Sequence, residues 1–229
     1  MGEQSKNINN SSRSEERPNR EKARFAALWV RCLGGKSTTA ETVYARLAEL
    51  YGEPHRHYHT LDHIQHCLSE FDRAADLMEN SDAVELALWF HDAIYQPGAI
   101  DNELRSAELF ERYFQGSANP DFRRRVWDLI LITTHRESPR HPDERFIMDI
   151  DLSSLGQAWD ECEQDGSRIR AEYAHLNDED YYPGQLRFLR SLRDRPSFFF
   201  TDFFRRRYER VACENVRRII TDLQARGYD

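Results

Sequence analysis

The sequence predicts an all-α protein. From Arg24 onward the apolar residues recur mainly at spacings of three and four, which is the period of an amphipathic helix, rather than in the alternation typical of strands. Helix-start residues and Pro or Gly breaks divide the chain into segments of helix length. With 229 residues, 39% of them hydrophobic, the chain is long enough for one buried core with a helical annex. We therefore expect one helical domain over residues 23–229.

Residues 1–22 differ from the rest of the chain in composition. They are rich in Ser, Asn, Glu and Arg and carry almost no apolar side chains. Such a segment cannot bury enough apolar surface to offset the entropy lost on ordering. We expect a disordered polar tail ahead of the domain.

The first helices have readable starts. Thr38 and Glu41 form a capping-box pattern ahead of a helical apolar repeat, and Gly52 ends that helix. A further helix starts near Thr60 and continues to about Phe71. Both predictions depend on a cap residue placed just before an apolar stripe.

The later boundaries follow from Pro, Gly, Asp and Asn. Pro97 and Gly98 interrupt the chain, and Asn119-Pro120 supplies an N-cap followed by a proline in the first turn. The helices expected on this basis cover about residues 82–95, a segment opened by Asp101, and residues 121–135, 157–176, 179–194 and 201–226.

Residues 146–152 are ambiguous in isolation. Their apolar side chains alternate with Asp149 and Asp151, as they would in a short strand. Helical neighbours on both sides and the short length of the segment favour a buried helical turn instead.

Composition excludes several classes of function. A formal net charge of −8 disfavours nucleic-acid polymers as partners, because such binding depends on Lys and Arg neutralising phosphates. No stretch approaches the ~20 apolar residues of a membrane span, and no secretory leader is recognisable. We expect a cytoplasmic protein that does not engage membranes, and a homodimer is compatible with the sequence. Four scattered cysteines without a Cys-x-x-Cys pair indicate reduced thiols: Cys32, Cys67, Cys162 and Cys213.

Two imidazoles and two carboxylates are the candidate metal ligands. His91-Asp92 closes the apolar run 84–90, His63 lies upstream, and Asp151 is favoured downstream with Asp149 as the alternative. This mixed nitrogen and oxygen set suits Mn²⁺, Mg²⁺, Fe²⁺, Ni²⁺ or Co²⁺, with one or two ions in the site. The residues are far apart in sequence, so only a helical bundle that folds back on itself brings them together.

These residues carry a resemblance to the HD superfamily of metal-dependent phosphohydrolases, whose pattern is a lone His, a His-Asp doublet and a distal Asp. Residues 58–64 also resemble the Tyr-His-Asn-x-x-His signature of cyclic-nucleotide phosphodiesterases, and a bacterial subfamily of predicted HD phosphohydrolases is similar over residues 24–226. The motifs that carry this similarity are Tyr58-His59-Thr60-Leu61-Asp62-His63-Ile64, His91-Asp92-Ala93-Ile94-Tyr95, Asp101-Asn102-Glu103-Leu104-Arg105-Ser106-Ala107 and Ile169-Arg170-Ala171-Glu172-Tyr173.

The resemblance implies an HD-domain helical bundle and roles for the two histidines of the upstream motif. His63 would be the metal ligand and His59 the acid that protonates the leaving oxygen. Asp92 would be both a ligand and a catalytic residue that bridges to a second ion if one binds. A divalent ion lowers the pKa of water and screens phosphate charge, so metal-activated water is the expected nucleophile.

Outer residues are expected to contact the substrate. Glu103 and His135 are candidates to position water or phosphoryl oxygens, although His135 is equally explained as a helix C-terminal residue. Arg56, Arg105 and Arg136 lie near the motifs and could bind a phosphate, but each is also explained as a surface or ion-pair arginine.

The expected function is hydrolysis of a phosphoester or pyrophosphate bond in a small phosphorylated metabolite or nucleotide. One alternative is a metal-stabilised module that binds a nucleotide without turnover. The other is an HD-type di-iron oxygenase, which would use additional histidines such as His135 and His141.

Overall fold

The computed structural model describes residues 8–33, 37–114 and 119–229, with side chains described over 20–33, 39–114 and 119–229. These residues form ten α-helices, two short 3-10 helices and no strand, which confirms the all-α prediction. The helices are α1 (Ile8–Leu33), α2 (Ser37–Tyr51), α3 (Leu61–Ala74), η1 (Ala75–Leu77), α4 (Ser81–Phe90), α5 (Asn102–Tyr113), α6 (Pro120–Ile132), α7 (Pro142–Asp151), η2 (Leu152–Gly156), α8 (Trp159–Glu172), α9 (Asp178–Arg193) and α10 (Asp202–Ala225).

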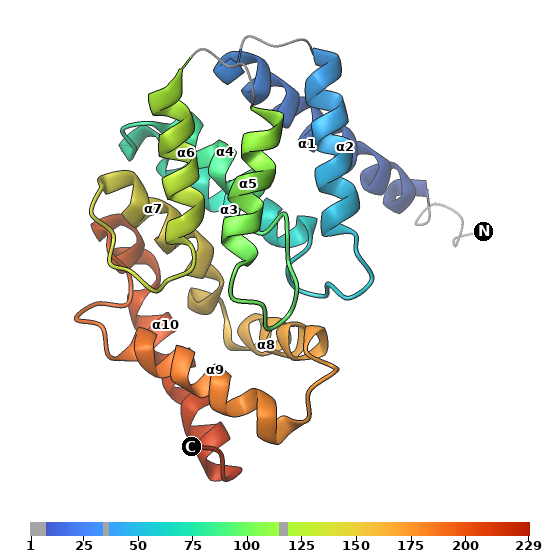
Figure 1. Cartoon of the computed structure of the whole chain (residues 1–229). Coiled ribbons are helices and arrows are strands. Elements are labelled where there is room, and N and C mark those ends of the chain that lie inside the picture. Colours follow the sequence, from blue (N-terminus) through green and yellow to red (C-terminus); the bar gives the residue numbers. More distant parts are fainter. Residues whose placement is uncertain (1–7, 34–36, 115–118) are drawn as a thin grey trace.

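Helix α4 is the central element of the fold. Its residues 83–90 are all buried, and it packs against α1, α3, α5, α6 and α7 (Figure 1). A helix that is apolar on every side is stable in water only when other helices surround it. Its one buried carboxylate, Glu85, accepts a hydrogen bond from Arg24 Nε at 2.6 Å. The chain therefore reaches His91, directly after α4, inside the molecule.

Two predicted helix starts are confirmed by their caps. The side chain of Thr60 accepts a hydrogen bond from the backbone N–H of Asp62 at the start of α3. Asn119 accepts from Asp121 and Phe122 at the start of α6, where Pro120 is the first helical residue. The segment 146–152, which could have been a strand, lies in α7 and the first residue of η2. The preference for a helical turn there is confirmed.

Several helix boundaries differ from the prediction, among them the end of α8 at Glu172 rather than at residue 176. Helix α4 ends at Phe90 rather than near Tyr95, because the chain turns at His91. Helix α6 ends at Ile132 rather than at His135, whose φ of 54° lies in the left-handed region and cannot continue a right-handed helix. Helix α2 starts at Ser37, one residue before the predicted cap Thr38, whose side chain lies outside the described residues.

Helix α1 overlaps the segment predicted to be disordered. Residues 8–22 belong to this helix, while residues 1–7 of the predicted tail lie outside the described residues. Phe25 and Trp29 in its second half are buried in the core. Once these packed turns form, extending the helix toward residue 8 requires little free energy per residue, because propagation of a helix is easier than nucleation.

Helices α8, α9 and α10 form the C-terminal annex and gather at one end of the molecule (Figure 1). The annex is tied to the bundle by η2, which packs along α10. Asn215 of α10 is buried, and its side-chain amide donates to the carbonyl oxygens of Leu155 and Gln157 at 2.9 Å each. The annex therefore fixes the segment that directly follows α7.

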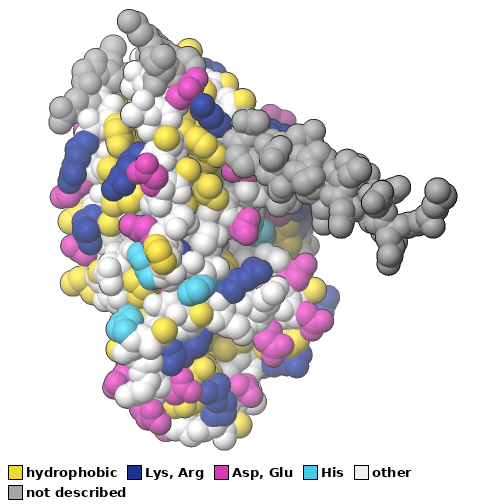
Figure 2. Space-filling model, turned by 90° about the vertical axis from the view of Figure 1, so that its right-hand side faces the viewer, with side chains coloured by type: hydrophobic (Ala, Val, Ile, Leu, Met, Phe, Trp, Pro, Cys, Tyr) yellow, Lys and Arg dark blue, Asp and Glu magenta, His cyan; other side chains and the backbone are white. Residues whose placement is uncertain are grey.

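No helix within the described part of the chain is both long and apolar enough to cross a bilayer. Over the face shown in Figure 2, acidic and basic side chains are interspersed with apolar ones, and histidine side chains reach the surface.

The close packing of η2 on α10 gives a stability prediction. A Cβ at Gly156 would lie 2.6 Å from Cβ of Tyr208, so Gly156→Ala is expected to destabilise the protein by about 1–3 kcal/mol through overpacking. At Gly166, inside α8, a Cβ would meet no atom within 4 Å. Gly166→Ala is therefore expected to stabilise the protein by about 0.5–1 kcal/mol. Urea unfolding of both variants measures this contrast, and equal effects of the two substitutions would contradict the packing seen here.

Candidate metal centre

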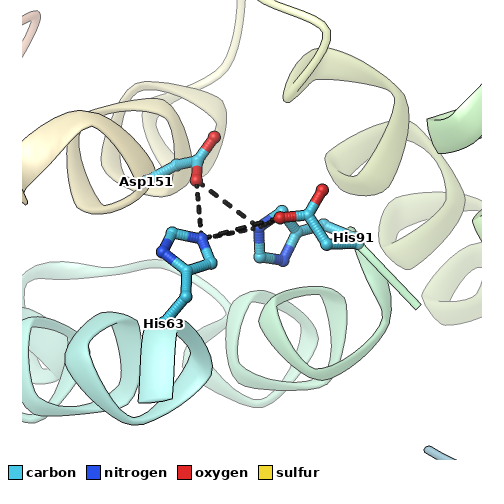
Figure 3. Close-up of side chains that lie close together, drawn as sticks. His63, His91 and Asp151 are labelled. Atoms are coloured by element: carbon cyan, nitrogen blue, oxygen red, sulfur yellow. Dashed lines mark hydrogen bonds and ion pairs between the residues drawn. The ribbon is translucent and has the colours of Figure 1, made fainter. Parts of the chain in front are cut away.

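Four predicted ligands converge at the centre of the bundle. His63 lies on α3, His91 and Asp92 directly follow α4, and Asp151 ends α7. Each contributes one nitrogen or oxygen atom, and all four atoms lie within 4.8 Å of one another. Figure 3 shows the rings of His63 and His91 and the carboxylate of Asp151 pointing toward a common centre. The group is largely buried, so three helices distant in sequence form one polar cluster inside the core.

The spacing of these atoms fits one divalent ion. Nε2 of His63 lies 3.3 Å from Nε2 of His91 and 3.2 Å from Oδ1 of Asp151. Nε2 of His91 lies 3.4 Å from Oδ1 of Asp151 and 3.0 Å from Oδ2 of Asp92. Two ligands at about 2.1 Å from an ion, in octahedral or tetrahedral geometry, are separated by about 3.0–3.4 Å. The cluster thus has the dimensions of a coordination sphere.

The protonation of His91 also fits a ligand. Its Nδ1 lies 2.9 Å from the carbonyl oxygen of Leu88, which only accepts hydrogen bonds, so Nδ1 carries the proton in the neutral ring. The lone pair is then on Nε2, the atom that faces the other members of the cluster. Metal-bound histidines are commonly oriented through their second nitrogen in this way.

The charges of the cluster call for a cation. Burial lowers the pKa of His91, but the carboxylates of Asp92 and Asp151 outweigh this effect and raise it well above its usual value. Burial raises the pKa of Asp151, but hydrogen bonds from His135, His63 and His91 outweigh it, so this pKa lies well below its usual range. The pKa of Asp92 is lowered too, chiefly by His91 against the effect of burial. Both carboxylates are ionised, and either imidazole protons or a divalent ion balances them.

The structure separates the two candidate aspartates. Asp151 belongs to the cluster, as the sequence favoured. The carboxylate of Asp149 instead accepts hydrogen bonds from the backbone N–H of Phe200 and from the N–H and hydroxyl of Thr201, at 2.7–2.8 Å. Burial raises the pKa of Asp149 to about 7 despite these donors. The carboxylate of Asp149 therefore faces the start of α10 rather than the cluster.

His135, predicted as an outer residue, contacts a ligand. Its Nε2 lies 2.8 Å from Oδ2 of Asp151, whereas His63 contacts the other carboxylate oxygen, Oδ1. The backbone of His135 has a φ of 54°, and a non-glycine residue in this region is held there at a cost of about 1–3 kcal/mol. This strained turn aims the ring at the carboxylate of Asp151, so His135 orients a ligand in the structure, while its contact with water or a phosphoryl group stays a prediction.

His59 lies beside the cluster and is oriented by a residue that the sequence did not single out. Its Nδ1 lies 2.6 Å from Oε2 of Glu172, and its ring stacks on Tyr95 with 4.1 Å between centroids. The other oxygen of Glu172 accepts the backbone N–H groups of His57, Tyr58 and His59 at 2.8–2.9 Å. Glu172 was noted only as part of a motif on α8. Its partners lie more than a hundred residues away, so no local pattern indicated this contact.

Arg56, a candidate to bind phosphate, is buried inside the protein. Its side chain is fully buried, and the guanidinium donates to the carboxylate of Glu53 and to the carbonyl oxygens of His59, Asp92 and Ala93 at 2.6–3.2 Å. Its nitrogens are therefore engaged inside the protein and join the two histidine motifs. The geometry supports a positioning role for Arg56 rather than a contact with substrate.

The remaining predicted residues differ in position. Glu103 is partly buried near the cluster: burial and the charge of Asp92 raise its pKa, opposed by Arg136. Arg105 is exposed on α5, and none of the described contacts links its side chain to the cluster. The predicted contact of Arg105 with a phosphate therefore stays a prediction.

Comparisons of the chain with protein families, with curated proteins and with solved structures found no match. The functional interpretation therefore depends on the geometry of the cluster and its surroundings.

The contact between His135 and Asp151 predicts an effect on metal affinity. His135→Asn keeps a residue that tolerates positive φ but removes the imidazole that orients Asp151. We expect Mn²⁺ to bind about 10–100-fold more weakly, measured by isothermal titration calorimetry. His141→Asn is the matched control, because His141 caps α7 and asparagine is a good N-cap. Equal affinity of His135→Asn and wild type would show that the contact does not position the ligand.

The charge balance of the cluster predicts a pH dependence. Because the pKa of His91 is raised in the metal-free protein, its proton competes with the ion at neutral pH. Affinity for Mn²⁺ is expected to rise with pH, by up to about tenfold per pH unit for each proton released. Calorimetric titrations at about pH 6, 7 and 8 in two buffers of different ionisation enthalpy measure the affinity and the proton release together. An affinity that stays constant over this range, with no proton release, would contradict the competition.

Proposed function

We propose that the chain is a metal-dependent phosphohydrolase of the HD type that acts on a small phosphorylated metabolite or nucleotide. The observation that carries this proposal is the buried convergence of His63, His91, Asp92 and Asp151, with a separately oriented imidazole, His59, beside them. The ring centroids of His59 and His63 lie 6.0 Å apart. A bound divalent ion would supply Lewis acidity, lowering the pKa of a water molecule and screening the charge of a phosphoryl group.

His59 is suited to donate a proton to the leaving oxygen. The pKa of Glu172 is lowered to about 2 because hydrogen bonds from His59 and the neighbouring N–H groups outweigh burial. Glu172 is thus an ionised acceptor and fixes the proton on Nδ1 of His59, which leaves Nε2 for proton transfer. Burial lowers the pKa of His59, but Asp92 and Glu172 outweigh it and raise the pKa above its usual value. The protonated form of His59 that a general acid requires is therefore favoured relative to an ordinary histidine.

Glu103 is a further residue of the proposed site. Its carboxyl group is partly buried, and no described side chain donates a hydrogen bond to it. Burial and the charge of Asp92 raise the pKa of Glu103 above its usual value. In the proposed reaction Glu103 accepts a hydrogen bond from a water molecule and orients it.

The arrangement favours hydrolysis over the alternatives. An oxygenase of this type would need further histidines, but His141 caps α7, and its Nε2 lies 3.2 Å from Glu79. Of the two histidines His135 and His141, only His135 contacts a member of the cluster. A module that binds without turnover would have no use for a histidine oriented as His59 is by Glu172. Both observations support the hydrolase.

A turnover assay tests the proposal. Wild-type protein supplied with Mn²⁺, Mg²⁺, Co²⁺ or Fe²⁺ is incubated with a panel of phosphomonoesters, cyclic nucleotides and nucleoside polyphosphates, and released product is measured. His59→Asn is expected to lower kcat by about 10²–10⁴-fold, the usual size of general acid catalysis, while leaving Mn²⁺ affinity unchanged. His57→Asn, at a neighbouring exposed side chain, serves as the matched control and should retain activity.

The same assay distinguishes the alternatives. Tight nucleotide binding without turnover under any of these metals would favour the binding module. Oxygen uptake by an iron-loaded sample, with no phosphate release, would favour the oxygenase. Turnover that is unaffected by His59→Asn would remove the assigned acid.

A further inference from the structure

A cavity of about 360 Å³ lies against His135. It is bounded by the turn that follows α6, by the end of α9 and by the segment that leads into α10. Three arginines line it, Arg136, Arg195 and Arg205, against a single acidic residue, Glu137. This excess of positive charge stands out in a chain of net charge −8. Concave surfaces with a local excess of one charge attract ligands of the opposite charge.

Arg195 has donor capacity that the protein does not use. Its Nη1 is buried without a hydrogen-bond partner, and its Nη2 reaches the carbonyl oxygen of His135 only at 3.5 Å. Burial lowers the pKa of this guanidinium, partly offset by the charge of Asp149. A desolvated cation without an ion-pair partner is unfavourable, and an anion in the cavity would remove that cost.

The other two arginines have distinct places. Arg136 is exposed, and within the described residues its guanidinium makes no hydrogen bond or ion pair. Arg205 is engaged with the carbonyl oxygens of Phe199 and Phe200 and with Asp202, so it shapes the wall of the cavity. Arg136 and Arg195 are therefore the cations available to a ligand.

The guanidinium of Arg195 is also held in position. It lies over the ring of Phe200, 5.3 Å from the centroid. Stacking of this kind fixes the plane of the guanidinium while leaving its edge free for a planar or tetrahedral oxyanion. Ser138 and Ser197 line the same cavity, and a serine hydroxyl can donate a hydrogen bond.

We propose that this cavity binds an oxyanion, the phosphate or carboxylate group of a small molecule, with Arg136 and Arg195 as its ion-pairing residues. The cavity meets the metal cluster at His135, whose Nε2 contacts Asp151. If the proposed function holds, the substrate carries two anionic groups, one at the metal centre and one in this cavity. That statement about substrate rests on the proposed function, whereas the binding of an oxyanion does not.

The test uses the full chain with its metal removed by a chelator, so that an anion cannot bind through the ion. Inorganic phosphate, pyrophosphate and citrate are titrated calorimetrically into the wild type and into Arg195→Gln, Arg136→Gln and Arg210→Gln. Arg210 is an exposed arginine on α10 in an i,i+4 pair with Glu214, which makes it the matched control. At least one of the anions is expected to bind, and each of the first two substitutions should weaken it by about tenfold or more, since a hydrogen bond to a charged group is worth that much. Arg210→Gln should leave the affinity within about twofold.

Three results would overturn the proposal. The first is that none of the anions binds the metal-free protein. The second is binding that both Arg195→Gln and Arg136→Gln leave unchanged. The third is an equal loss in Arg210→Gln, which would show attraction to net charge alone. Arg136→Gln, at an exposed side chain, keeps the test decisive if Arg195→Gln fails to fold. Because no metal is present, the outcome does not depend on whether the chain hydrolyses any substrate.

Discussion

The structure depends on one electrostatic constraint, the burial of the carboxylates of Asp92 and Asp151 within a few ångströms of each other. Two negative charges in a core of apolar helices are unfavourable unless positive charge lies between them. His91 supplies it when protonated, and a divalent ion supplies it when that imidazole is neutral. The ligand atoms lie at distances that suit such an ion. Protons and metal are therefore alternative ways of stabilising the same arrangement.

The surrounding helices keep this arrangement in place. Helix α4 is buried over residues 83–90 and ends at Phe90, directly before His91 and Asp92, so its packing fixes two of the four ligands. Arg56 donates hydrogen bonds to the backbone carbonyl oxygens of His59, Asp92 and Ala93. The carboxylate of Glu172 accepts hydrogen bonds from the backbone N–H groups of residues 57–59, just before α3. The loop that carries His59 is thus held from two directions. Its imidazole is oriented before any ligand arrives, which is the condition for efficient proton transfer.

The sequence predicted the parts of this structure that depend on local chemistry. Caps such as Thr60 and Asn119 mark helix starts because their side chains bond to N–H groups only a few residues away. The doublet His91-Asp92 stood out because it follows an apolar run. By contrast, the role of Glu172 and the buried position of Arg56 arise from contacts between distant segments, which no spacing indicates. Asp149 and Asp151 were distinguished only in part, since their difference lies in which way each side chain points on α7.

We expect His63, His91, Asp92 and Asp151 to share one cation. Anomalous diffraction from crystals of the protein grown with Mn²⁺ measures this. A strong anomalous peak is expected within about 2.0–2.3 Å of Nε2 of both histidines and of one oxygen from each aspartate. Crystals grown with Mn²⁺ that show no anomalous peak between these side chains, or that show manganese only elsewhere, would contradict a shared cation.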